Sequence, residues 1–138
     1  MSAQRIPARL RAKVRDRARG RCEYCGVHEE DVGAPHEPDH IVAEQHGGKT
    51  TAQNLAYACY QCNRYKGSNL ASVDPESGQP VFLFHPRRDT WADHFQINGA
   101  LIIGLTPVGR TTSALLKFNA PERLESRRLL LLAQRYPG

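Results

Sequence analysis

The first regular pattern of apolar residues lies near the N-terminus, in a segment rich in arginine. Ile6, Leu10 and Val14 recur every four residues, which places them on one face of a helix. Pro7 suits the first turn of such a helix, and a glycine follows where the helix would end. The pattern predicts a helix over residues 7–19, with one apolar face and basic residues on the others.

Shorter segments follow, separated by turns and loops. Residues 21–28 are typical of a tight turn, and residues 59–70 are typical of a second turn that leads into a short helix. Residues 39–42 predict a short strand, and residues 51–57 predict a helix.

The C-terminal half has a different pattern. Short apolar runs predict strands over residues 81–85, 94–97 and 100–105. Two helices are expected after them, from residue 106 to about 116 and from residue 121 to about 136, the last with a broad face of leucines. The mixture of helices and short strands indicates the α+β class.

The size and composition of the chain narrow the possibilities. It has 138 residues and a mass of 15.4 kDa, the size of one ordinary domain, with a globular balance of 24% charged and 40% hydrophobic residues. No apolar run approaches the ~18–20 residues of a membrane span, and the N-terminus lacks the apolar core of a secretory signal. We therefore expect a cytoplasmic protein without a membrane partner.

The net charge of +5 is distributed unevenly. Residues 1–21 contain eight basic residues and one acid, whereas residues 22–138 contain 11 basic and 13 acidic residues. A basic arm suits contacts with phosphate groups, although a solvated helix that only aids solubility fits the same charge. Residues 22–48 contain seven acids and no lysine or arginine, so we expect a cation site there.

The four cysteines form two C-x2-C pairs, Cys22 with Cys25 and Cys59 with Cys62. Two such turns provide the four thiolates of a closed tetrahedral site, the geometry that structural Zn²⁺ favours. Two disulfides are an alternative that the missing secretory signal weakens, and a redox site would need only one pair. We expect a structural zinc site that joins two distant segments.

Groups suited to hydrolysis lie between the cysteine pairs and directly after Cys62. Asp39 offers a hard oxygen ligand for Mg²⁺ or Mn²⁺, and Asn63 offers an amide oxygen for the same ion. His40 can accept a proton near neutral pH. Neighbours on a strand point to opposite faces, so the sequence leaves open whether Asp39 and His40 serve one site.

In this order and spacing, the motifs resemble those of the HNH endonucleases, which have a ββα-metal fold. The resemblance covers about residues 20–70, and the residues that carry it are Cys22, Cys25, Asp39, His40, Ile41, Gly47, Gly48, Asn54, Leu55, Cys59, Cys62, Asn63 and Lys66. The third motif position is an asparagine rather than a histidine, so the chain resembles an H-N-N variant.

The resemblance implies a zinc-stabilised, metal-dependent phosphodiesterase that cleaves DNA. His40 would act as the general base, and Asp39 and Asn63 would hold one Mg²⁺ or Mn²⁺ ion. Asn54 would orient the loop that bears the histidine. The zinc would be structural, because four thiolates leave no open position for substrate.

We interpret the chain as a single domain, residues 1–138. It would consist of a basic N-terminal helix (1–21), an HNH core (22–70) and a C-terminal extension of strands and helices (71–138). The expected context is a prokaryote or phage, and the oligomeric state is left open.

Basic side chains are expected to contact the phosphates of double-stranded DNA; they are Arg11, Lys13, Arg15, Arg64 and Lys66. The alternative function is a non-catalytic, zinc-stabilised nucleic-acid-binding module. Such a module has no need for an acid, a base and an amide beside its zinc turn, so the endonuclease is favoured.

Overall fold

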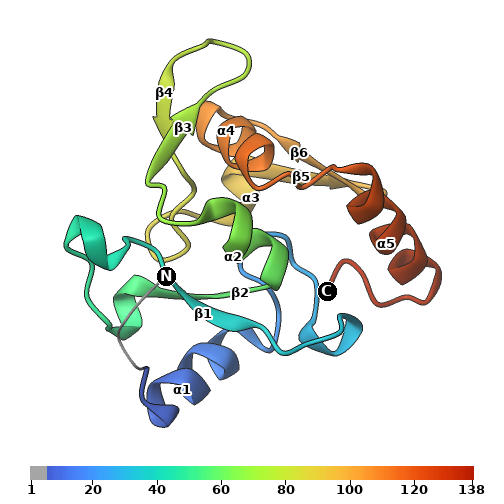
Figure 1. The fold of residues 1–138 in the computed structure, drawn as a ribbon. Helices are drawn as coiled ribbons and strands as arrows, with labels where there is room; N and C mark the ends of the chain where they lie inside the picture. Colours follow the sequence, from blue (N-terminus) through green and yellow to red (C-terminus); the bar gives the residue numbers. More distant parts are fainter. Residues whose placement is uncertain (1–5) are drawn as a thin grey trace.

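The computed structural model describes residues 6–138, and its centre is a ββα unit (Figure 1). Strands β1 (Glu37–His40) and β2 (Leu55–Ala58) pair antiparallel, and helix α2 (Tyr60–Lys66) follows β2 almost directly. The strand predicted over residues 39–42 is present, but it begins and ends two residues earlier.

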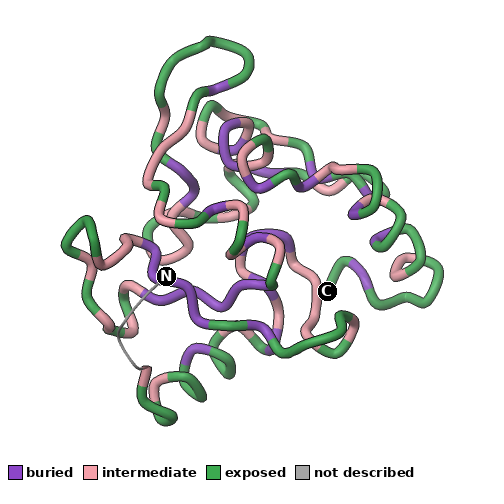
Figure 2. The backbone as a smooth tube through the Cα atoms, viewed as in Figure 1, coloured by how far each residue is buried: buried purple, intermediate pink, exposed green. Residues whose placement is uncertain are grey.

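The helix predicted over residues 51–57 is wrong. A 3₁₀ turn (Ala52–Asn54) is followed there by β2, in which all four residues are buried (Figure 2). A helix in a small protein keeps one polar face toward water, whereas a strand packed on both sides can be apolar on both faces. Pairing with β1 and burial on two sides therefore override the local preference for a helix.

Helices α1 (Ala8–Ala18) and α2 lie on opposite faces of the β1–β2 pair (Figure 1). Val14 of α1 packs against Leu55 and Tyr57, whereas Ala56 and Ala58 join the core that α2 and the cysteines share. The apolar face predicted for the first helix is confirmed, since its two earlier members pack against the same cluster as Val14.

Residues 71–138 form two hairpins and three helices. In chain order the elements are β3 (Ala71–Val73), β4 (Pro80–Phe82), α3 (Trp91–His94), β5 (Phe95–Asn98), β6 (Leu101–Gly104), α4 (Pro107–Leu115) and α5 (Pro121–Leu132). β3 pairs with β4 and β5 with β6, both antiparallel. The predicted α+β class is confirmed. Within residues 6–138, no helix combines the length and apolar character that crossing a membrane requires.

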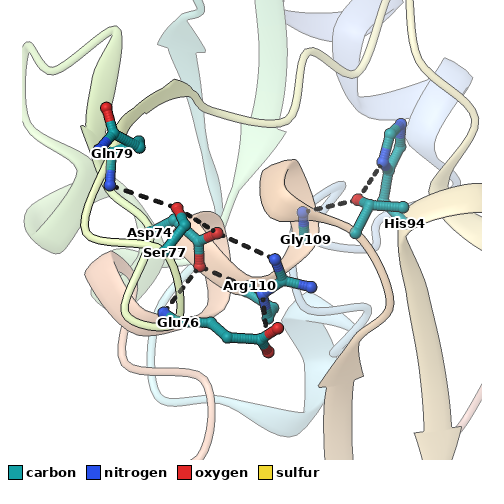
Figure 3. Close-up of polar contacts among 8 residues, drawn as sticks. Asp74, Glu76, Ser77, Gln79, His94, Gly109 and Arg110 are labelled. Atoms are coloured by element: carbon teal, nitrogen blue, oxygen red, sulfur yellow. Dashed lines mark hydrogen bonds and ion pairs between the residues drawn. The ribbon is translucent and has the colours of Figure 1, made fainter.

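An ion pair between the buried Asp74 and the partly exposed Arg110 fixes the β3–β4 hairpin to α4 (Figure 3). The Asp74 carboxylate is shielded from solvent and accepts two hydrogen bonds from the Arg110 guanidinium, at 3.1 and 2.9 Å. The same carboxylate accepts from the Glu76 N–H and the Ser77 hydroxyl, which closes the hairpin turn. One carboxylate therefore sets both the shape of the hairpin and its position on the helix.

The leucine face predicted for the last helix is wrong. Leu129 and Leu132 of α5 are 59% and 83% exposed, whereas Arg123 and Arg127 are buried. Arg127 donates to the carbonyl groups of Ala100 and Phe118, at 2.7 and 2.6 Å. Buried carbonyl groups outside regular structure need hydrogen-bond donors, and one arginine side chain supplies several. The inner face of α5 therefore carries arginines rather than leucines.

Candidate metal centre and nuclease site

All four cysteines meet at one buried point. Their Sγ atoms lie within 4.8 Å of one another, and those of Cys25 and Cys59 are 3.8 Å apart. In a tetrahedral site with zinc–sulfur bonds of about 2.3 Å, neighbouring sulfurs are roughly 3.8 Å apart. The donors and their spacing fit zinc, and no other group of three or more His, Cys, Asp or Glu ligands occurs within residues 6–138.

Two similar turns place the sulfurs. The Cys25 N–H points to the Cys22 Sγ at 3.5 Å, and the Cys62 N–H points to the Cys59 Sγ at 3.4 Å. Burial raises the pKa of Cys22 and of Cys62, whereas hydrogen bonds from the neighbouring thiols lower the pKa of Cys25. Metal binding to all four thiolates would release the protons that burial otherwise retains.

Asp39 lies in a buried polar cluster under α2. Its Oδ2 accepts a hydrogen bond from the Tyr24 hydroxyl at 2.9 Å and lies 3.1 Å from the Lys66 Nζ. Burial raises the pKa of Asp39, and the Lys66 ammonium and the Tyr24 hydroxyl act against that shift. A carboxylate at this depth is stable as an anion only because a cation and a hydroxyl contact it.

The structure places Lys66 differently from the expected contact with DNA. The side chain is 2% exposed, and its ammonium donates to the carbonyl oxygens of His40 and Ile41 at 3.1 and 3.2 Å. Lys66 follows Cys62 by one helical turn, so it shares the inward face of α2. Its observed role is to join α2 to the end of β1, and the expectation of a surface contact is corrected.

His40 stands at the last position of β1. Its Nε2 lies 2.9 Å from the hydroxyl of Thr50, and the residue is 8% exposed. The cross-strand neighbours of Asp39 and His40 are Ala56 and Leu55, which belong to the two different cores. The two side chains therefore leave β1 on opposite faces, as strand geometry requires.

Asn54 secures the loop that follows His40. Its side-chain oxygen accepts from the Val42 N–H at 2.9 Å, and its amide donates to the carbonyls of Val42 and Lys49 at 2.9 and 2.8 Å. Gly48 passes so close to the Val42 carbonyl that a Cβ atom would overlap it. The asparagine and the glycine together determine the path of the chain from β1 back to β2.

One cleft of about 620 Å³ brings together four of the candidate site residues. Asp39, His40 and Asn63 contribute to its lining, and so does the exposed Arg64. Asn54 and Lys66 are not among its lining residues and support it through the contacts described above. The other expected phosphate contacts, Arg11, Lys13 and Arg15, are exposed on α1, across the β1–β2 pair from α2.

The acidic stretch 22–48 does not form the single cation site that its composition predicts. Five of its seven acids pair instead with separate cations: Glu23 with Arg87, Glu30 and Asp31 with Arg135, Glu37 with Arg11, and Asp39 with Lys66. Only Asp39 and Glu44 of these acids line the cleft. The charge clustering in sequence therefore reflects several structural ion pairs and two acids at the cleft.

Sequence reasoning missed two residues of this site. Tyr24 contacts Asp39 from between the first two cysteines, and Thr50 contacts His40 from the glycine-containing loop. The position of Tyr24 inside a C-x2-C turn was a usable signal, because the two cysteines of that turn both belong to the four-cysteine cluster. Thr50 carried no local signal.

The fold and the site together define a class of protein: a ββα unit with a four-cysteine cluster, in which Asp39, His40 and Asn63 are among the residues that line one cleft. Residues 22–69 match the family model described as HNH endonuclease. The segment that holds the cysteines and the cleft residues therefore resembles an HNH endonuclease domain, over about a third of the chain. No curated protein and no solved structure shows a significant match to the chain.

Proposed function

We propose that this protein is a metal-dependent endonuclease that hydrolyses phosphodiester bonds in DNA. The observation that supports the proposal is the presence of Asp39, His40 and Asn63 in the lining of one cleft. A carboxylate, an imidazole and an amide are what hydrolysis of a phosphodiester with one divalent cation requires. The proposal also agrees with the family of the domain that contains them.

His40 is the general base in this proposal. Its Nε2 is engaged by the Thr50 hydroxyl, so Nδ1 is the ring nitrogen that would accept a proton from the attacking water. The contact with Thr50 also fixes the rotation of the ring. Asn54 acts at a distance, because it holds the loop that carries Thr50 and closes behind the histidine.

Asp39 and Asn63 would hold one Mg²⁺ or Mn²⁺ ion, because hard cations prefer carboxylate and amide oxygens. Such an ion, when bound, neutralises charge on the scissile phosphate and on the leaving 3′ oxygen. Tyr24 and Lys66 both contact Oδ2 of Asp39, and these two contacts fix the orientation of the carboxylate. Oδ1 takes part in neither contact and is the oxygen that we propose for the metal ion. In this role Lys66 is a positioning residue.

Contacts with the DNA backbone fall to exposed basic residues. Arg64 lines the cleft itself, and Lys13 and Arg15 are exposed on α1. Arg11 is exposed as well, but it also pairs with Glu37 at 2.6 Å and would have to exchange that partner for a phosphate. Such contacts are independent of base sequence, so we propose double-stranded DNA as the substrate and leave its sequence unassigned.

Relaxation of supercoiled plasmid in the presence of Mg²⁺ or Mn²⁺ tests the proposal. His40→Ala should slow nicking by about 100-fold or more, since general base catalysis contributes at least that much. His46→Ala is the matched control, because His46 is an exposed histidine in the adjacent loop. Equal nicking by the His40 variant and the parent would exclude the mechanism.

The same assay distinguishes the endonuclease from the alternative function, a nucleic-acid-binding module without catalysis. A protein that retards the plasmid in a gel but cuts it with neither metal would be a zinc-stabilised nucleic-acid-binding module. Such a module would retain DNA affinity in the His40 variant and lose it on removal of the basic residues of α1. The endonuclease requires a cleavage rate that depends on His40.

A further inference from the structure

The C-terminal extension contacts the four-cysteine site directly, through a buried arginine of α5. Nη2 of Arg123 donates to the Cys62 Sγ at 3.2 Å and points to the Cys59 Sγ at 3.9 Å. We propose that Arg123 is an outer-shell residue of the zinc site, which stabilises the bound metal and links it to the docking of α5. This inference concerns the cysteine site and does not depend on the proposed nuclease activity.

The electrostatics of the site call for such a cation. A zinc ion bound by four thiolates carries a formal charge of about −2, and this site is buried. An uncompensated charge in a protein interior is costly, and a guanidinium that donates to the sulfurs compensates part of it. A hydrogen bond to a thiolate also disperses charge that the zinc–sulfur bonds do not neutralise.

Arg123 in turn depends on the sulfurs. The residue is 4% exposed, and within residues 6–138 it forms no ion pair with a carboxylate; its other main contact is with the Leu116 carbonyl at 2.6 Å. The guanidinium lies instead against the sulfurs of Cys62 and Cys59, which are thiolates when they hold a metal ion. The thiolates are therefore the countercharge that allows an arginine at this position.

Two further side chains of the extension brace the other cysteine turn. The Tyr136 hydroxyl donates to the Cys25 carbonyl at 2.9 Å, and the Trp91 indole N–H donates to the Tyr24 carbonyl at 2.8 Å. Both halves of the metal site are thus held from residues 71–138. Because the contacts join the two parts, loss of zinc should loosen the extension, and loss of the Arg123 contact should weaken zinc binding.

Competition for zinc between the full chain and a chromophoric chelator tests the proposal. Arg123→Gln should bind zinc about 10- to 100-fold more weakly than the parent, the usual effect of removing an outer-shell partner. Arg128→Gln removes the same charge from an exposed position on the same helix and should leave zinc affinity unchanged. Arg123→Lys, which keeps the charge, should fall between the parent and the Gln variant.

The cobalt-substituted protein supplies a readout that a packing role would not change. Removal of a hydrogen bond to a thiolate should shift the sulfur-to-cobalt charge-transfer band in Arg123→Gln, but not in Arg128→Gln. If the glutamine variant does not fold, the band position in Arg123→Lys decides. Unchanged zinc affinity, or weaker binding with an unchanged cobalt spectrum, would overturn the proposal.

Discussion

The Lys66 ammonium lies 3.1 Å from the Asp39 carboxylate, and both side chains are almost completely buried, at 2% and 5% exposure. The pair links α2 to β1 at the point where the candidate site begins. Removal of one member leaves the other charge without its partner in the interior, which typically costs about 3–5 kcal/mol. Lys66→Met should therefore lower the free energy of unfolding by that amount, measured by urea denaturation.

A double-mutant cycle tests whether the pair is the cause. Asp39→Asn combined with Lys66→Met should cost less than the sum of the two single changes, because the double variant buries no unpaired charge. Lys49→Met is the control, since Lys49 is exposed on the loop between the strands. Additive costs in the cycle would show that Lys66 acts only through its carbonyl contacts and its packing.

Asn54 makes three hydrogen bonds with the loop that follows His40. At about 0.5–1.5 kcal/mol each, Asn54→Ala should lower the free energy of unfolding by roughly 2–4 kcal/mol. If the loop also positions Thr50 and His40, nicking should fall by about 100-fold even at temperatures where the variant is folded. Asn98→Ala, at an exposed asparagine of β5, should change neither stability nor rate.

Zinc should be part of the folded state. Binding to a four-cysteine site contributes about 10–16 kcal/mol, as much as or more than the ~5–15 kcal/mol that stabilises a whole domain. Elemental analysis should therefore find about one zinc per chain, and chelation or Cys62→Ser should unfold the core. A metal-free protein with the parent's thermal unfolding midpoint would contradict this expectation.

The ion pair of Asp74 with Arg110 should make the stability of the fold sensitive to acid. The hydrogen bonds from Arg110 hold the pKa of Asp74 below its ordinary value, so its contribution to stability is complete above roughly pH 4 and is lost as the pH falls below that. The unfolding temperature of the parent should therefore decline between about pH 4 and pH 2 more steeply than that of Asp74→Asn.

The control for this pH dependence is Asp16→Asn, at an aspartate whose side chain is 72% exposed. It should keep the parent's pH profile. If Asp74→Asn has the same profile as the parent as well, the acid sensitivity arises from other carboxylates.

Local chemistry was sufficient to locate the four-cysteine cluster and the segment that matches the HNH family model. Cysteines three residues apart must lie on tight turns to share a metal, and the positions of Asp39, His40 and Asn63 relative to those turns identify the HNH segment without knowledge of the fold. The amphipathic pattern of α1 was equally direct, because a helix with one apolar face has a single way to pack.

Only the tertiary structure decided which charged side chains are buried, and whether a short apolar segment forms a helix or a strand. Leu55–Ala58 became a strand because β1 was available to pair with it and both its faces were covered. Lys66 and Arg123 have sequences around them that are typical of solvated helices, yet both are buried, because Asp39 and the cysteine sulfurs meet them from distant parts of the chain. Burial of a charge depends on a partner, and a partner far along the chain leaves no periodic signal in the sequence.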